Sequence, residues 1–265
     1  MSMKGLAAPR EATGFVFVSG TSRDCLKAAT AGTRVTLPTF TPPWIVVEHS
    51  LERVPVTRWP GRLFRARVVP PVTDEERAAM ARAAGGLSSG AGFTRAIAVD
   101  LLAELSPSVL FGPHGDNVIR VLEAGLALDE EGARKLASAR HPEAAEEYHK
   151  AWDRWLVDQP EGEHYRNQDH ASTLSIPGAG PSRSPIGHGF SLIWWVVTKS
   201  AQHRGRARSF TLDEDGDPAL ADPWESALSA LLDTAMACGA PHLSDSEAAT
   251  VLSTAWHAVF GPEDV

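Results

Sequence analysis

The pattern of hydrophobic and polar positions divides the chain into a β-like part followed by a helical part. Residues 15–18, FVFV, form a short apolar run typical of a buried strand, and residues 22–30 follow with the spacing of a helix. The segments TRVTL (33–37) and PPWIVVEHS (42–50) predict two more strands, with prolines marking the entrance of the second. We therefore expect a mainly β unit at the N-terminus.

The stretch RVPVTRWPGRLFRARVV, residues 53–69, predicts a β-hairpin. Apolar residues recur on both sides of Trp59-Pro60-Gly61, where proline fixes φ and glycine accepts a positive φ. A tryptophan at the tip of a hairpin should be exposed. After the turn, two arginines that should point to solvent alternate with three apolar residues that should point inward, because side chains alternate along a strand: Arg65 and Arg67 against Phe64, Ala66 and Val68.

From residue 72 onward the pattern becomes helical. The first helix has Thr73 as its N-cap and Glu76 three residues later, which is the spacing of a capping box. Further helices are expected over residues 91–105, 115–128, 129–140, 142–157, 223–238 and 245–260. Because strands and helices are segregated, we predict an α+β protein: an N-terminal mainly antiparallel β unit with a hairpin (residues 1–71), followed by a larger, mainly helical region (72–265) in the same or a second domain.

An irregular segment over residues 158–189 interrupts the helical region. Glycine, proline, serine and polar residues occur throughout it, and a run of this length in a compact chain is often a functional loop. We expect it to be less ordered than its flanks unless a ligand is bound. It holds the densest group of residue types suited to general acid and base catalysis, namely Glu163, His164, Asp169 and His170.

The turn Ser19-Gly20-Thr21-Ser22 lies between the first strand and the first helix. Free N–H groups at a helix start can bind an anion, and Ser19, Gly20, Thr21 and Ser22 are candidate anion-binding residues. Capping of the helix by Thr21 or Ser22 is the other interpretation. The stretch resembles the strand–turn–helix of ADP-ribosyltransferases and tRNA 2′-phosphotransferases, in which a His-Gly-Thr triplet ends a strand. Gly20 and Thr21 match the triplet, but Ser19 stands in place of the nucleotide-binding histidine.

The segment DEDGDP, residues 213–218, is an acidic turn. It has aspartates at alternate positions, as calcium-binding loops do. An EF-hand loop counted from Asp213 would need glycine and glutamate where the chain has Pro218 and Trp224. We expect no metal here, and no cofactor motif occurs elsewhere.

Composition limits the classes of partner and the cellular compartment that fit this chain. The formal net charge of −8 makes nucleic acid an unfavourable partner. Cys25 and Cys238 do not have the spacing of a zinc site or of a disulfide framework. The N-terminal sequence lacks the pattern of a secretory signal. No apolar stretch is long enough to span a membrane. These features favour a cytoplasmic protein, and the Ala- and Arg-rich composition is typical of a GC-rich bacterial gene.

Two functions of different classes fit the sequence. The first is a non-catalytic, regulatory or protein-binding protein that binds a protein partner or forms a homo-oligomer, using Trp59, Arg65 and Arg67. Eight tryptophans support it, because large rings often anchor interfaces. The second is an enzyme of the transferase or hydrolase class, acting on a phosphorylated or nucleotide substrate. In that case the histidines of residues 158–189 should close over the turn at Thr21.

Overall fold

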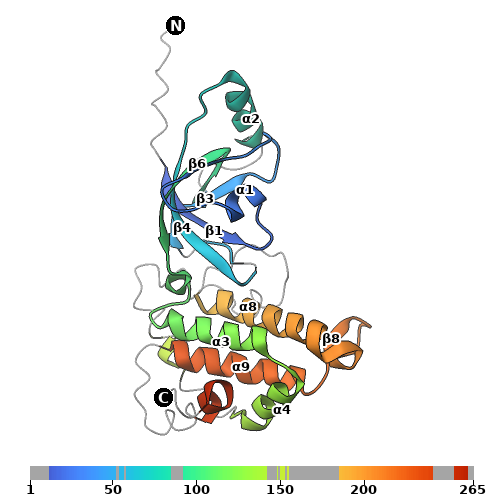
Figure 1. Cartoon of the computed structure of the whole chain (residues 1–265). Helices are drawn as coiled ribbons and strands as arrows, with labels where there is room; N and C mark the ends of the chain where they lie inside the picture. The colour runs from blue at the N-terminus through green and yellow to red at the C-terminus, as the bar shows by residue number, and fades with distance from the viewer. Residues whose placement is uncertain are drawn as a thin grey trace. The chain divides into compact units, whose positions relative to one another are not determined.

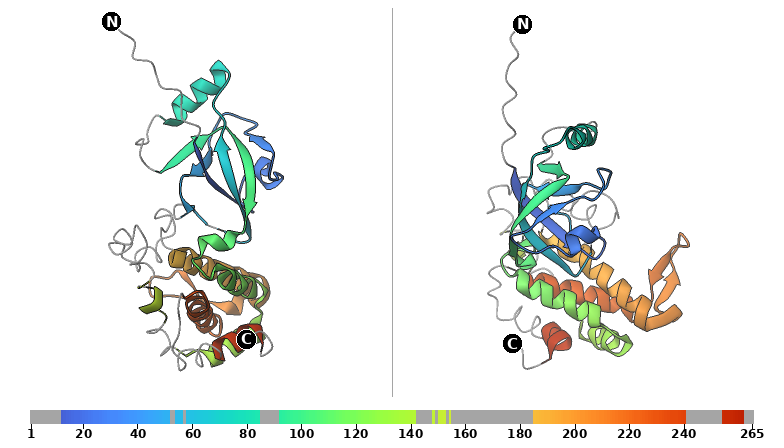
Figure 2. Two further views of the ribbon diagram at one scale, coloured as in Figure 1. Left: turned by 90° about the vertical axis from the view of Figure 1, so that its left-hand side faces the viewer. Right: turned by 45° about the horizontal axis from the view of Figure 1, so that its top comes forward.

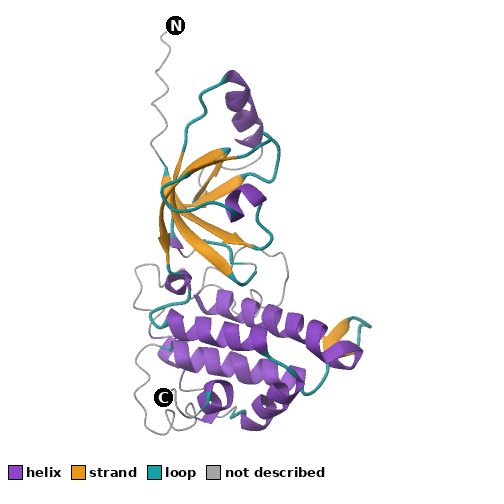
Figure 3. Ribbon diagram, in the orientation of Figure 1, coloured by secondary structure: helices purple, strands orange, loops and turns teal. Residues whose placement is uncertain are grey.

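The chain forms two compact units, Met1–Pro107 and Ser108–Val265, in a computed structural model. The structure describes residues 12–51, 54–56, 58–84, 92–141, 148, 150–152, 154, 185–240 and 254–261. The first unit contains a six-stranded antiparallel sheet, and the second contains most of the helices (Figures 1 and 3). The predicted α+β class is therefore confirmed. We call these parts the sheet unit and the helical unit.

The sheet has the strand order β2-β6-β4-β1-β3-β5. Its strands are β1 (Thr13–Ser19), β2 (Arg34–Thr36), β3 (Ile45–Glu48), β4 (Gly61–Val68), β5 (Phe93–Ala96) and β6 (Ala98–Leu105). The predicted first three strands are confirmed. The helix expected over residues 22–30 is a single turn, α1 (Asp24–Lys27).

One face of the sheet, which we call the inner face, carries the core of the sheet unit. Alternate residues of each strand point to this face, and Leu26 of α1 packs against them. The buried residues of this core are Val16, Val18, Leu26, Ala29, Val35, Leu37, Ile45, Val47, Phe64, Ala66, Ala96, Val99 and Leu101. Burial of these apolar side chains fixes the register, because a shift by one residue would turn every strand over.

The predicted hairpin around Trp59 is wrong in its first strand. Residues 54–56 are not a strand, and β4 pairs instead with β1 and β6. The prediction for the faces of β4 is confirmed: Phe64 and Ala66 are buried in the inner core and Val68 packs against it, whereas Arg65 is exposed. The local alternation was therefore informative, but it did not identify the strands that pair with β4.

The helix expected over residues 91–105 is also wrong, because this segment forms β5 and β6. β6 lies between β2 and β4, so it is hydrogen-bonded along both edges. These long-range pairings outweigh the local preference of its alanines and leucines for helix. The last two strands of the sheet consequently come from the part of the chain that was assigned to the helical body.

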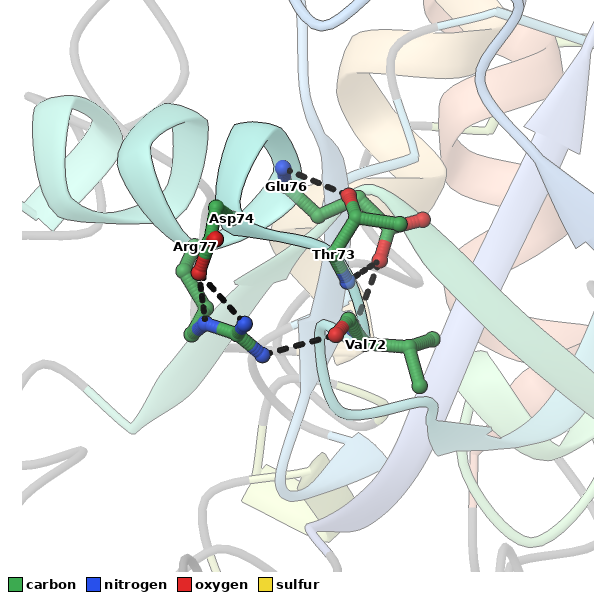
Figure 4. Close-up of polar contacts among 5 residues, drawn as sticks. All are labelled: Val72, Thr73, Asp74, Glu76 and Arg77. Atoms are coloured by element: carbon green, nitrogen blue, oxygen red, sulfur yellow. Dashed lines mark hydrogen bonds and ion pairs between the residues drawn. The ribbon is translucent and has the colours of Figure 1, made fainter.

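Helix α2 (Asp74–Ala84) begins with the predicted capping box, shown in Figure 4. Thr73 Oγ1 accepts a hydrogen bond from the Glu76 N–H at 3.1 Å. In return, Glu76 Oε2 accepts from the N–H of Thr73 at 2.9 Å and from the N–H of Val72 at 2.6 Å. These bonds satisfy N–H groups that a helix start leaves without partners, and they lower the pKa of Glu76.

The helical unit is built mainly from α3 (Gly115–Ala127), α4 (Glu130–Ala139), α8 (Pro185–Ser200) and α9 (Trp224–Gly239). Helices α3, α8 and α9 pack against one another, and α4 packs against α9 (Figure 1). Short helical segments lie at Pro107–Leu110, Ala201–Gly205 and Arg206–Ser209. Of the helix expected over 245–260, residues 254–260 are helical. No helix in the described ranges is long and apolar enough to cross a membrane.

Helix α8 was not predicted, and its first residues, 185–189, were assigned to the irregular segment. The apolar run that follows belongs to the same helix, and Trp194 within it is half exposed. A two-stranded antiparallel ribbon, β7 (Phe210–Leu212) and β8 (Pro218–Leu220), precedes α9. The acidic segment 213–217 forms the turn of this ribbon, as the sequence indicated.

Candidate functional site

The predicted catalytic residues lie outside the described part of the chain. Glu163, His164, Asp169 and His170 all fall between residues 155 and 184. Their convergence on a catalytic site, and the expected mobility of this segment, stay predictions. No group of three or more potential metal ligands occurs among the residues that the structure describes.

The polar groups of the turn at Ser19–Ser22 are hydrogen-bonded to one another. The N–H groups of Ser19 and Ser22 donate to Ser22 Oγ and to the Ser19 carbonyl, each at 3.0 Å, and the Thr21 N–H donates to Ser19 Oγ at 3.4 Å. The hydroxyls of Ser19 and Thr21 also bond each other at 3.0 Å. An anion would have to replace these bonds, so binding at Ser19, Gly20, Thr21 and Ser22 stays a prediction.

The capping interpretation of this turn is wrong. Helix α1 begins at Asp24, and its N-cap residue is Arg23, whose side chain makes no capping hydrogen bond. Ser22 instead accepts from Ser19 within the preceding turn. The spacing of serine and threonine did mark a turn, but the turn closes on itself two residues before the helix.

Trp59 is 4% exposed, so the expectation that it protrudes from a hairpin tip is wrong. The segment before β4 is packed inward: Val54 is fully buried and Val56 is 4% exposed. A hairpin tip would have projected from the sheet, whereas this segment buries its apolar side chains. Of the three residues proposed to bind a partner, Arg65 and Arg67 are therefore the ones that reach the surface.

Arg65 and Arg67 belong to a cluster on the outer face of the sheet, opposite the inner core. Arg67 lies beside Asp100 of β6, and Asp100 in turn lies beside Arg34 of β2. Arg65 lies beside Phe15 of β1, whose ring is partly exposed. We call these residues the arginine face: Phe15, Arg34, Arg65, Arg67 and Asp100. With three arginines and one aspartate, this face has a formal charge of +2.

Asp100 holds two of the three arginines in place. Its carboxylate accepts two hydrogen bonds from Arg34, with Nε at 2.7 Å and Nη2 at 3.1 Å, and a third from Arg67 Nη2 at 3.2 Å. Such a two-point contact fits the planar guanidinium to the carboxylate and fixes its orientation. Arg65, in contrast, is exposed and makes no side-chain hydrogen bond or ion pair with the described residues.

These contacts shift the titration of Asp100. The hydrogen bond from Arg34, with a smaller contribution from Arg67, lowers the pKa of Asp100 below its ordinary value of 3.8. A carboxylate whose pKa is lower in the folded state stabilises the fold above its unfolded pKa. That contribution is lost as the pH falls through the lowered pKa of the folded protein.

We expect Asp100→Asn to reduce the acid sensitivity of the sheet unit. Between about pH 5 and pH 2, the wild type should lose more free energy of unfolding than the variant, because only the wild type has a carboxylate to protonate at this position. Urea unfolding at a series of pH values measures both slopes. Equal slopes would show that the pairing of Asp100 with Arg34 and Arg67 adds nothing to stability.

Charge is distributed unevenly between the two units. Residues 1–107 contain 13 Lys and Arg against 9 Asp and Glu, a formal net charge of +4. Residues 108–265 contain 12 against 24, a net charge of −12. The overall charge of −8 therefore conceals a cationic sheet unit, which changes the kind of partner that this unit attracts.

Comparison with known proteins does not assign this chain to a family. No protein-family model, no curated protein and no solved structure matches the chain. The short resemblance of the Ser19–Ser22 stretch to ADP-ribosyltransferases therefore has no support beyond its own residues.

Three members of the arginine face were missed by sequence reasoning: Phe15, Arg34 and Asp100. The alternation of residues 13–19 contained a signal for Phe15, because Val16 and Val18 point inward. Arg34 and Asp100 had no such signal, since their proximity depends on the pairing of β2 with β6. That pairing was hidden once residues 91–105 were interpreted as a helix.

Proposed function

We propose that this chain is a non-catalytic binding protein whose arginine face binds an acidic segment of a partner protein. The observation that carries the proposal is the arrangement of Arg65, which is exposed and unpaired among the described residues and lies beside Phe15. Arg67 follows two residues along the same strand and the same face, and Asp100 links it to Arg34 on β2. Guanidinium groups bind carboxylates through two parallel hydrogen bonds, and arginine and aromatic residues are enriched at protein interfaces.

The fixed positions of Arg34 and Arg67 favour binding. Side chains that are already ordered lose little conformational entropy when a partner arrives. Both are still accessible, with 59% and 41% of their side-chain surface exposed. Phe15 supplies an apolar contact beside Arg65 on the same face. A partner with carboxylates flanking an apolar side chain matches this combination.

Nucleic acid is the less favourable partner for this face. Asp100 places a carboxylate between two of the three arginines, where it would repel a phosphodiester backbone. The whole chain also carries a net charge of −8. The enzyme alternative depends on His164 and His170, which lie outside the described residues.

Charge reversal at Arg65 tests the proposed function. We expect Arg65→Glu to weaken binding about tenfold or more, because it replaces an attraction by a repulsion at this face. The measurement is fluorescence anisotropy with two labelled probes, an aspartate- and glutamate-rich peptide containing leucine and a single-stranded oligonucleotide. Affinity capture from lysate with quantitative mass spectrometry then identifies proteins that bind through Arg65.

The control is Lys27→Glu, a single charge reversal on α1, which covers the inner face of the same sheet. Lys27 is exposed and, in the part of the chain that the structure describes, forms its ion pair with its neighbour Asp24 at 3.2 Å. This variant should bind the peptide as the wild type does. Equal peptide binding by Arg65→Glu, or a preference of the wild type for the oligonucleotide, would contradict the proposed function.

A further inference from the structure

The ribbon β7–β8 is an acidic protrusion of the helical unit. It pairs with none of the other described strands, and Figure 2 shows it extending from one end of the helices. Its turn carries four acidic residues, Asp213, Glu214, Asp215 and Asp217, all exposed. Leu212, at the end of β7, is 69% exposed and lies directly beside them in the chain. We call residues 212–217 the acidic tip.

The acidic tip has a defined conformation. Asp213 Oδ1 accepts from the N–H of Asp215 at 3.0 Å and from the N–H of Asp217 at 2.8 Å. The Asp213 N–H donates to the Asp217 carbonyl at 2.9 Å, and Gly216 adopts a φ of 84°, a region that favours glycine. The carboxylate of Asp213 therefore holds the turn together, as in an Asx turn.

The other three carboxylates of the tip are not needed for its fold. Glu214, Asp215 and Asp217 form no side-chain hydrogen bond or ion pair with any described residue. On this small protrusion the three carboxylates are well solvated. The exposed side chain of Leu212, however, leaves apolar surface in water. Such a surface gains free energy when a cationic and partly aromatic surface covers it.

The arginine face has that complementary character. It carries a charge of +2 and a partly exposed phenyl ring, whereas the acidic tip carries −4 and an exposed leucine. The same complementarity holds for whole units, at +4 and −12. Resting on the proposed function, we infer that the acidic segment bound by the arginine face is the acidic tip of a second copy of this chain.

The contact would join two different surfaces, so it is heterologous. Each copy offers one arginine face and one acidic tip, and two copies joined in this way still have one of each unoccupied. Head-to-tail contacts of this kind produce open chains or closed rings. The tip is small, so the interface falls below the size of a stable dimer, and we expect a weak contact with a Kd on the order of 10–100 µM.

Two variants that remove charge from one surface each test this contact. The face variant, Arg34→Ala with Arg65→Ala, leaves the pair of Asp100 and Arg67 intact. The tip variant, Glu214→Gln with Asp215→Asn and Asp217→Asn, leaves Asp213 to hold the turn. Both variants should stay folded. The tip variant should melt close to the wild type, and the face variant slightly below it because it loses the Arg34–Asp100 pair.

Analytical ultracentrifugation over a range of concentrations is the measurement. The wild type should sediment faster as its concentration rises, and added salt should reverse the effect because it screens exposed charges. Each variant alone should raise the Kd of self-association about tenfold or more. In an equimolar mixture, the intact tip of the face variant can bind the intact arginine face of the tip variant. The mixture should therefore form a one-to-one dimer that does not grow, because that dimer has no intact face or tip left unoccupied.

The outcomes separate this inference from the proposed function. A wild type whose sedimentation does not change with concentration up to about ten times the expected Kd overturns the inference, and so does a mixture that stays monomeric when the wild type associates. If the acidic peptide still binds in an Arg65-dependent manner, the proposed function stands and its partner is another protein. Loss of both results would overturn both.

Discussion

Replacement of Trp224 by alanine is expected to destabilise the helical unit by about 3–5 kcal/mol. Trp224 starts helix α9 and is 1% exposed, which makes it the largest fully buried side chain among the described residues. Its ring lies against the backbone of Gly205, where an added Cβ would approach Trp224 Cε2 to 2.9 Å. Truncation would leave a cavity between α9 and the segment Ala201–Ser209. Urea unfolding followed by circular dichroism of the helices measures the loss.

Trp194→Ala is the matched control, since Trp194 lies on α8 of the same unit but is 50% exposed. Its truncation removes far less buried surface and should cost at most about 1 kcal/mol. A Trp224→Ala variant as stable as this control would show that α9 does not pack as described.

Phe64→Ala should destabilise the sheet unit by a similar amount, about 3–5 kcal/mol. Phe64 is fully buried at the centre of β4, opposite Val16 of β1 and Glu104 of β6. The guanidinium of Arg62 also lies 4.7 Å from its ring centroid, a cation–π contact that alanine cannot make. Hydrogen exchange of the backbone amides of β1, β4 and β6 measures the change, because core strands exchange only on global opening.

Leu102→Ala serves as the control for Phe64→Ala. Leu102 lies in the same sheet, next to an irregularity in the pairing of β4 with β6, and is 41% exposed. We expect its replacement to change stability by about 0.5 kcal/mol or less. The Phe64→Leu variant should recover most of the loss, because leucine refills part of the volume. Unchanged exchange in Phe64→Ala would contradict the inner core.

The fold was predictable where short-range signals decide the structure. Thr73 and Glu76 lie three residues apart and meet in a capping box, and the period-two alternation of β4 correctly separated Arg65 from Phe64. The signals failed where distant strands decide. Residues 98–105 became a strand because β2 and β4 lie on either side of them, and no pattern within that segment contains this information.

The candidate site was predictable only in part, for the same reason. Arg65 and Arg67 were selected because they alternate with apolar residues on one strand. Arg34 and Asp100 are 66 residues apart, and their contact exists only after β2 has paired with β6. Trp59 was misplaced because Trp-Pro-Gly indicates a turn but does not specify whether that turn projects or packs inward.

The position of β6 in the sheet affects how the protein is made. β6 is the last strand of the sheet unit to be synthesised, yet it lies between β2 and β4 and is the only strand that pairs with β2 in the described sheet. Until residue 105 has left the ribosome, one edge of β4 lacks its final partner and β2 is not paired with any strand of the described sheet. Unpaired strand edges bind other chains, so a nascent or truncated chain that ends before β6 is exposed to aggregation. Fragments of this protein should therefore extend at least through Leu105 to remain soluble.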